Sequence, residues 1–208
     1  MRRLLSCGMI CMIAVCLALT LVACKDQQTE PPTDSRPSYD ADKLSDYVQL
    51  DAYTDLKIPL KAENASKGEA VWEAILARAQ VMSYPEEAVS YYAEQERQAC
   101  RYYAKENDVS YEDAMNALGL TEDGILAQAK QMVKSDLVYE YIRADAEISL
   151  TEKEKSDLFD RYASRLAVQH GYETSYVKEQ MASLVYETML YDKTMEYLIV
   201  HNEFIVAE

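Results

Sequence analysis

Glycine, proline and basic residues are all scarce in this 208-residue chain. Five glycines and five prolines leave few turn positions, and this scarcity favours helices. Lysine and arginine total 21 against 36 aspartates and glutamates, which gives a formal net charge of −15. Nucleic-acid binding requires a basic face, so the charge argues against that class of partner. Hydrophobic residues make up 49% of the chain, enough to build a core.

Histidine is also rare, and no catalytic or metal-binding motif is present. His170 and His201 have no carboxylate or thiol at a spacing typical of a metal site. We interpret His170 as a partner of a helix C-terminus and His201 as a surface residue. No nucleophile motif and no glycine-rich phosphate loop occurs. We therefore expect no enzyme, no metal and no cofactor.

Four of the five cysteines fall within the first 24 residues, so Cys100 is the one thiol that remains in the rest of the chain. If the first three cysteines are removed with a signal peptide and Cys24 carries a lipid, as argued in the next paragraph, no partner remains for Cys100 and an intrachain disulfide is excluded. Cys100 stands in a helical run of alanines and tyrosines, and we interpret it as a packed structural thiol. The alternative is a reactive thiol, which would need exposure and a lowered pKa.

The first 24 residues resemble a bacterial lipoprotein signal. Two arginines precede an apolar run, 4–22, and residues 21–24, LVAC, are similar to a lipobox. By that resemblance the signal peptide, 1–23, is removed and Cys24 carries the lipid. An uncleaved membrane anchor is the alternative, because twenty residues can span a bilayer. Both interpretations attach the chain to the cell membrane and place it on the extracytoplasmic side.

The chain after the signal divides into three further parts. Residues 24–46 are polar and contain three prolines, which is typical of a flexible tether. Residues 47–66 are predicted to form an extended connector, because apolar residues alternate at Val48 and Leu50 and again at Leu56, Ile58 and Leu60. Pro59 restricts the segment to a sheet edge. Residues 67–208 are helical. Without residues 1–23, 19 basic and 36 acidic side chains leave a net charge of about −17.

Local signals place the helix ends. Thr151 and Glu154 have the spacing of a capping box, and Gly171 favours the left-handed conformation that closes helices. Pro85 is expected at the first position of its helix. Trp72 is expected to anchor the core from the first helix. The expected helices are 67–82, 85–107, 110–119, 121–147, 151–171 and one long helix from residue 175.

Apolar stripes define two of these helices. In the helix from 121, five residues recur at three or four positions and share one face: Leu126, Ala129, Val133, Leu137 and Tyr141. From residue 175 a heptad seam runs without a break through Val177, Met181, Leu184, Thr188, Tyr191, Met195, Leu198, Asn202 and Ile205. About 27 helical residues would span on the order of 40 Å. Such a length predicts a helix that projects or lies against a partner helix.

Four segments in this order resemble the C-terminal chaperone domain of trigger factor. They are 71–87, 119–142, 147–154 (EISLTEKE) and 184–204 (LVYETMLYDKTMEYLIVHNEF), and they span about two thirds of the chain. The resemblance implies an elongated all-α fold of the trigger factor or SurA type, with long paired helices that form arms. The ribosome-binding and prolyl-isomerase domains of that family have no counterpart here, so isomerase activity is not expected.

The resemblance also implies that the arms hold unfolded polypeptides by dispersed apolar contacts. Tyrosine offers contact area at low entropic cost and methionine adapts to varied surfaces. The candidate cargo residues are Tyr91, Tyr92, Tyr102, Tyr103, Met132, Tyr139 and Met189. The two tyrosine pairs are eleven residues apart, three helical turns, and so superimpose on one face. The alternative for both residue types is ordinary packing between helices.

Two functional hypotheses remain open. The first is an ATP-independent holdase that binds unfolded, newly exported polypeptides at the outer face of the plasma membrane. The second is a lipid-anchored scaffold or assembly subunit, whose apolar stripes are buried in one dedicated partner or in a homodimer. The two differ in whether apolar surface stays open in the free protein.

Overall fold

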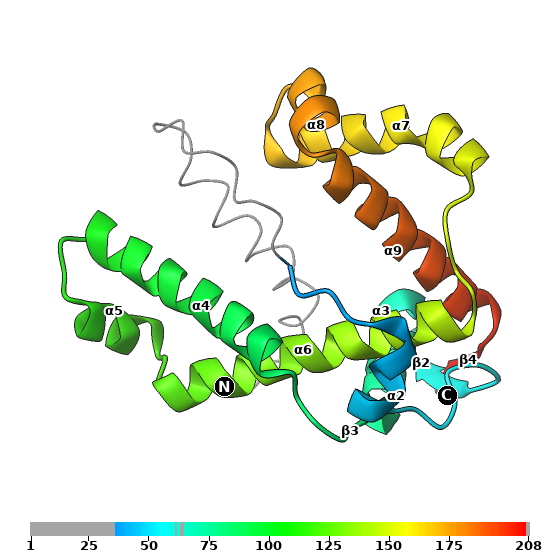
Figure 1. Ribbon diagram of the computed structural model, residues 1–208, viewed down its shortest axis with the longest axis horizontal. Helices are drawn as coiled ribbons and strands as arrows, with labels where there is room; N and C mark the ends of the chain where they lie inside the picture. Colours follow the sequence, from blue (N-terminus) through cyan, green and yellow to red (C-terminus); the bar gives the residue numbers. More distant parts are fainter. Residues whose placement is uncertain (1–35, 61, 63–64, 207–208) are drawn as a thin grey trace. The chain divides into compact units, whose positions relative to one another are not determined.

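The computed structural model describes residues 36–60, 62 and 65–206 (Figure 1). Most of these residues are helical and the strands are short, so the all-α class is confirmed in general terms. The signal peptide and Cys24 lie outside the described residues. The chain forms two compact units: residues up to Asp40 with Val81–Leu137, and Ala41–Gln80 with the chain from Val138 onward.

The first unit is built on three helices: α4 (Glu86–Glu106), α5 (Tyr111–Leu118) and the first half of α6 (Glu122–Asp145). Its core gathers Ala93, Cys100, Met115, Ile125 and Ala129. The local signals for α5 are confirmed, because the Ser110 side chain caps its start and Gly119 ends it at φ +67°. Pro85 is the N-cap of α4 in extended conformation, so the helix begins one residue later than expected, at Glu86.

The second unit holds the remaining elements. In chain order they are η2 (Ala41–Lys43), α2 (Leu44–Tyr47), β1 (Val48–Gln49), β2 (Lys57–Leu60), α3 (Lys67–Arg78), β3 (Gln80–Val81), the end of α6, α7 (Glu152–His170), α8 (Thr174–Gln180), α9 (Ala182–Val200) and β4 (Glu203–Val206). β1 is hydrogen-bonded to β3. Only the first residue of β3, Gln80, belongs to the second unit, and Val81 belongs to the first.

Within the predicted connector, 47–66, the structure has strands at β1 and β2, and the pairing of β2 was not anticipated. Ile58 and Leu60 are buried while Pro59 is exposed, as the alternation predicts. β2 pairs in parallel with β4, with Ile58 opposite Phe204. The tether expectation was wrong at its end: Leu44 is only 3% exposed, so packing begins before residue 46. Because the Leu44 side chain is buried in the core, the residues around it are part of the folded protein and do not belong to a flexible tether.

The first of the helices expected from the sequence, 67–82, is shorter than expected. α3 ends at Arg78 instead of Met82, because Ala79 adopts an extended conformation and leads into β3. The Ser66 side chain accepts a hydrogen bond from the Glu69 N–H and caps the start. Trp72 is buried, as expected.

The capping box at α7 is confirmed. The Thr151 hydroxyl accepts from the Glu154 N–H at 3.2 Å, and the Glu154 carboxylate accepts from the Thr151 N–H at 2.8 Å. Gly171 ends the helix in the left-handed conformation at φ +72°. The next turn therefore reverses the chain, and α8 and α9 both pack on α7.

The prediction of a single long helix from residue 175 is wrong. Met181 leaves the helical region with φ −127° and ψ 27°, which separates α8 from α9. Ile205 lies in β4, so the proposed seam ends before it. The break lets both pieces contact α7, which one straight helix would do over a single stretch only. Burial in the hairpin against α7 therefore replaces the expected heptad packing.

The apolar face of α6 is rotated from the expected one. Ile125 is fully buried and Leu126 is exposed, and at the other end Ile142 is buried while Tyr141 is half-buried. Ala129, Val133 and Leu137 are buried as expected. α6 begins in the first unit and ends in the second, so different faces are buried along its length.

Candidate functional site

The tyrosines of α4 stand beside its packing face rather than in it. That face consists of small residues: Ala88, Ala93, Cys100 and Ala104. Small side chains allow close approach of α4 and α5, and the larger tyrosines are left at the margins of the interface. The two tyrosine pairs nevertheless have different environments.

Tyr92 is joined to α6 through its half-buried hydroxyl. Its hydroxyl donates to the Asp136 carboxylate, and its ring packs at the edge of the first unit's core. Burial, together with the negative charge of Asp136, raises the pKa of Tyr92. Tyr91 contacts the Tyr92 ring edge to face at 5.1 Å. This pair is therefore largely a packing feature, in line with the alternative interpretation.

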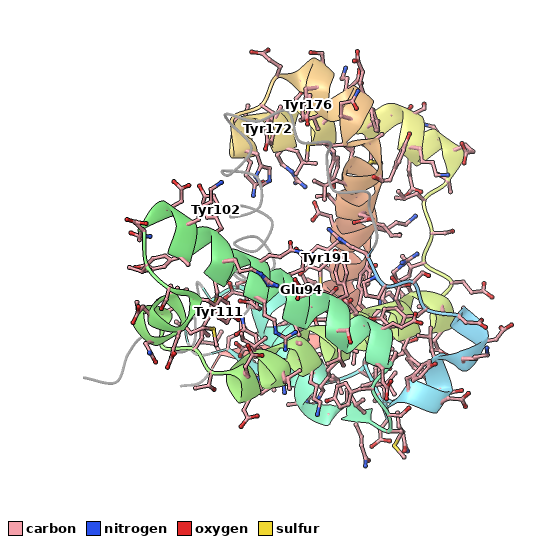
Figure 2. The ribbon with its side chains drawn as sticks, turned by 60° about the vertical axis from the view of Figure 1, so that its left-hand side comes forward. Glu94, Tyr102, Tyr111, Tyr172, Tyr176 and Tyr191 are labelled. Atoms are coloured by element: carbon pink, nitrogen blue, oxygen red, sulfur yellow. The ribbon has the colours of Figure 1, made fainter. Side chains whose placement is uncertain are left out.

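The second pair on α4 is more open to solvent. The Tyr102 side chain is 37% exposed, and Tyr103 is half-buried. About two turns earlier on α4, the Glu94 carboxylate forms an ion pair with the Arg101 guanidinium, with 2.6 Å between the oxygen and the nitrogen. Figure 2 labels Glu94 and Tyr102 on α4. Of the four tyrosines predicted on this helix, Tyr102 offers the largest accessible area.

The other predicted cargo residues do not gather in one place. Met132 is half-buried on the part of α6 in the first unit. Tyr139 belongs to the second unit, where its ring lies 6.0 Å from that of Tyr191, and burial raises its pKa to about 12. Met189 is only 2% exposed and packs in the core of the same unit. We therefore assign Met189 to the core.

An exposed aromatic surface at the junction of α7 and α8 was missed. We call the apolar side chains around the end of α7 and the start of α8 the tip surface: Val168, Tyr172 and Tyr176. Phe159 on α7 and Tyr186 on α9 form a separate aromatic pair of the same hairpin. The rings of Tyr172 and Tyr176 are 5.4 Å apart and those of Phe159 and Tyr186 are 5.1 Å apart. The Val168 side chain is 85% exposed and that of Tyr176 is 40% exposed. Figure 2 shows Tyr172 and Tyr176 together near this junction.

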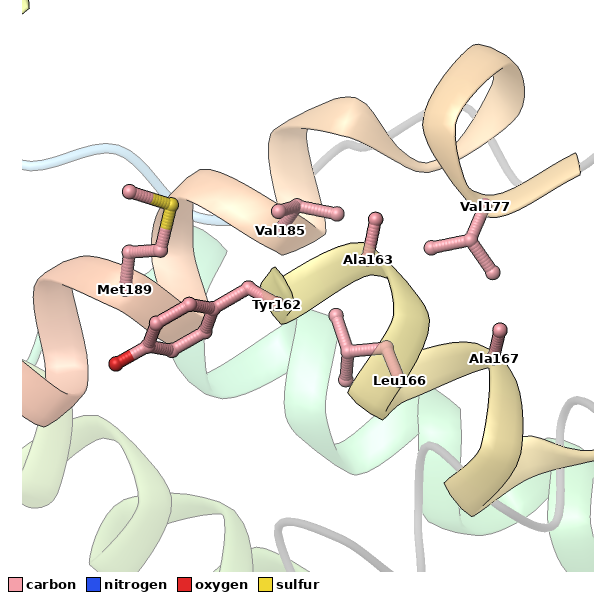
Figure 3. Close-up of a cluster of buried hydrophobic side chains, with 7 residues drawn as sticks. All are labelled: Tyr162, Ala163, Leu166, Ala167, Val177, Val185 and Met189. Atoms are coloured by element: carbon pink, nitrogen blue, oxygen red, sulfur yellow. The ribbon is translucent and has the colours of Figure 1, made fainter. Parts of the chain in front are cut away.

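A compact core lies behind the tip surface and holds it in place. Figure 3 shows Ala163 and Ala167 of α7 turned toward Val177 of α8, with Val185 of α9 near Ala163. Because alanines occupy the α7 side, the three helices approach closely and the larger aromatic residues are left outside. The sequence signal was the pair of tyrosines on either side of the helix start that follows Gly171: Tyr172 just before the N-cap Glu173, and Tyr176 in the first turn of α8.

Charged groups border the aromatic residues of this hairpin. Arg165 donates to Asp192 at 2.9 Å, and its guanidinium also lies 4.3 Å from the centre of the Tyr162 ring. The Tyr162 hydroxyl donates to the same carboxylate at 3.0 Å. Lys178 and Asp160 form a further ion pair at 2.8 Å. The border therefore carries both signs of charge, paired in the folded protein.

Cys100 and the histidines occupy the positions that the sequence indicated. Cys100 is fully buried in the first unit, and burial raises the pKa of its thiol, so the packed structural thiol is supported over the reactive one. His170 stands in the last turn of α7. His201 is exposed and stacks on Tyr197 at 4.1 Å. Among the described residues, no three histidine, cysteine or carboxylate side chains are grouped as a metal site.

Comparison of the chain with protein-family models, curated protein sequences and solved structures finds no match. In the part of the chain that the structure describes, no helix combines the length and apolarity needed to cross a membrane. The tip surface is therefore the strongest functional candidate on its own physical grounds. Tyr102 on α4 is the second.

Proposed function

We propose that the protein is an ATP-independent holdase that binds unfolded, newly exported polypeptides at the outer face of the plasma membrane. Cys24 carries the lipid that attaches it there. The binding surfaces are the tip surface in the second unit and Tyr102 in the first. The fold is of the trigger factor C-terminal type, as the four sequence segments suggest.

The tip surface is the observation that carries this proposal. Val168 and Tyr176 of the tip surface, and Tyr186 on the same helical hairpin, expose apolar area to solvent, and a core of buried side chains lies between the helices. Each buried side chain contributes roughly 1 to 3 kcal/mol of binding. Several such contacts made together hold a chain without reading its sequence, and tyrosine can serve apolar and polar segments alike.

Net charge sets the expected preference among clients. A net charge of about −17 without the signal peptide keeps the holdase soluble and favours basic unfolded chains. Exposed charges are screened by salt over about 8 Å at physiological ionic strength. Affinity for a basic unfolded client is therefore expected to fall as salt increases. Equal affinity at low and high salt would contradict this electrostatic contribution.

A dedicated-partner scaffold or homodimer is the second candidate, and the C-terminal region favours it. Val200 is 71% exposed, and Ile205 and Val206 also expose aliphatic side chains within the last seven described residues. Aliphatic area of this kind suits a fixed interface better than a promiscuous one. Light scattering distinguishes the two candidates: the holdase is a monomer that binds a hydrophobic dye, whereas the homodimer has twice the mass.

The direct test is aggregation of an unfolded client, followed by light scattering with and without the protein from residue 25 onward. A holdase suppresses aggregation at near-stoichiometric amounts. A folded protein with no effect on the client would refute the holdase and favour the scaffold. An unrelated acidic helical protein at the same concentration controls for charge and crowding.

A further inference from the structure

Residues 36–40 form an extended segment that lies on the first unit. Pro37 and Tyr39 are half-buried, whereas Arg36, Ser38 and Asp40 are exposed, so alternate side chains face the protein. This segment belongs to the same compact unit as α4 and α6 (Figure 1, blue). We call Arg36–Asp40 the strap.

One attachment of the strap is to a carboxylate of α6. The Tyr39 hydroxyl donates to Oδ2 of Asp136 on α6 at 3.4 Å, and the Tyr92 hydroxyl of α4 donates to the same oxygen. Two phenols from segments far apart in the sequence thus share one acceptor. The Tyr92 contact belongs to the packing of the unit, while the Tyr39 contact is made by a short extended peptide.

We propose that Tyr92 and Asp136, with Tyr91 beside them, form a binding site for an extended polypeptide segment that carries a tyrosine, and that the strap occupies this site in the free protein. The strap is a ligand of the same chemistry as a client: an extended backbone with alternate apolar side chains and a phenol. A client segment that also uses this site, in addition to the tip surface, must displace the strap, so the strap is autoinhibitory at this site. This inference rests on the proposed holdase function.

Competition within the chain gives the strap its effect. A segment tethered next to its site acts at a high effective concentration, in the millimolar range for short flexible linkers. A weak contact through Tyr39 is then enough to keep the site filled. Loss of one hydrogen bond to a carboxylate changes such an equilibrium by about fivefold or more.

The test uses the protein from residue 25 onward and a fluorescein-labelled peptide of residues 34–43. In the Tyr39→Ala protein the strap is weakened, so we expect the peptide to bind at least about fivefold more tightly than to wild type by fluorescence anisotropy. Ser38→Ala, at an exposed neighbouring position, is the matched control and should bind as wild type does. Circular dichroism checks that each variant is folded.

A second peptide tests the phenol directly. With phenylalanine in place of tyrosine, the peptide should bind the Tyr39→Ala protein about fivefold more weakly. Equal binding of the two peptides, or equal peptide binding by wild type and Tyr39→Ala, would overturn the proposal. Client affinity is measured on the same proteins and should rise in Tyr39→Ala. If the peptide results hold but no protein suppresses client aggregation, the site stands and the holdase function is refuted.

Discussion

Lys193 on α9 donates to both carboxylate oxygens of Glu154 at the start of α7, at 2.7 and 2.9 Å. Glu154 is also the residue that completes the capping box with Thr151. One carboxylate therefore accepts from the backbone N–H of the N-cap Thr151 and also joins α7 to α9. The hairpin that carries the tip surface is fixed at its base by this contact.

The Glu154 contacts predict a specific dependence of stability on pH. Hydrogen bonds from Lys193 and then from Thr151 lower the pKa of Glu154 from its ordinary value of 4.5 to about 2. Because the pKa is lower in the folded state, the contribution is complete above about pH 4.5 and is lost as the pH falls toward 2. Urea unfolding at several pH values should show a shallower decline for Glu154→Gln than for wild type.

Glu152→Gln is the matched control for this experiment, because it removes the same charge from the same helical turn but leaves the Lys193 contact intact. It should keep the wild-type slope between pH 4.5 and 2. An unchanged slope in Glu154→Gln would contradict the assigned role of that carboxylate.

Asn202 joins the end of α9 to the segment before β2. Its side chain donates to the carbonyls of Tyr53 and Leu198, at 2.9 and 2.7 Å, and accepts from the Leu56 N–H at 2.8 Å. Because Asn202→Ala leaves these backbone groups without their partner, we expect a loss of about 2 kcal/mol in the free energy of unfolding. Asn116→Ala, at an exposed position, should change it by less than about 0.5 kcal/mol. Equal stability of the two variants in urea would refute the prediction.

Cys100 should resist thiol reagents in the native protein. It is fully buried, and it is the one cysteine in the chain from residue 25 onward. Labelling by a coloured disulfide reagent should be slow in buffer and fast in urea, at a rate that follows unfolding. Cys100→Ser places a hydroxyl in an apolar core and should cost about 1 to 3 kcal/mol. Rapid labelling of the folded protein would revive the reactive-thiol alternative.

Gly171 should contribute to stability only because glycine adopts a left-handed backbone conformation without strain. A Cβ at this position meets nothing within 4 Å, yet φ is +72°, a region that costs a side-chain residue roughly 1 kcal/mol. Gly171→Ala should therefore destabilise the protein by about that amount. Gly68→Ala is the control, because Gly68 lies in α3 and its new Cβ would be at ordinary contact distance from Met195. It should be neutral or stabilising by up to about 1 kcal/mol. Similar losses in both variants would argue against backbone strain at Gly171.

Sequence reasoning succeeded where the determining interactions are local. Thr151 with Glu154 and Gly171 specify the ends of α7 within a few residues of chain, so their geometry could be predicted. The break at Met181 has no glycine or proline to announce it, and it depends on how α8 and α9 pack on α7. The pairing of β2 with β4 joins segments about 146 positions apart and has no local signal.

Exposure was the property that the sequence could least define. Met189 and Tyr176 both suit a promiscuous surface by residue type, yet the first is buried and the second is open. The difference depends on which faces of three helices meet. Leu126 was placed on the core face of α6 in the same way, and the neighbouring Ile125 takes that position. Periodicity identifies a helix more reliably than it identifies the buried side.

The binding of a permanently unfolded client to the tip surface tests the central claim most directly. Val168→Ser with Tyr176→Ser removes exposed apolar area from this surface, and Val200→Ser removes a similar exposed side chain elsewhere in the second unit. By fluorescence anisotropy, the double variant should bind the client at least about tenfold more weakly, with its helical content unchanged. The Val200→Ser protein should bind as wild type does. Wild-type affinity in the double variant would contradict the assignment of the tip surface as the place where clients bind.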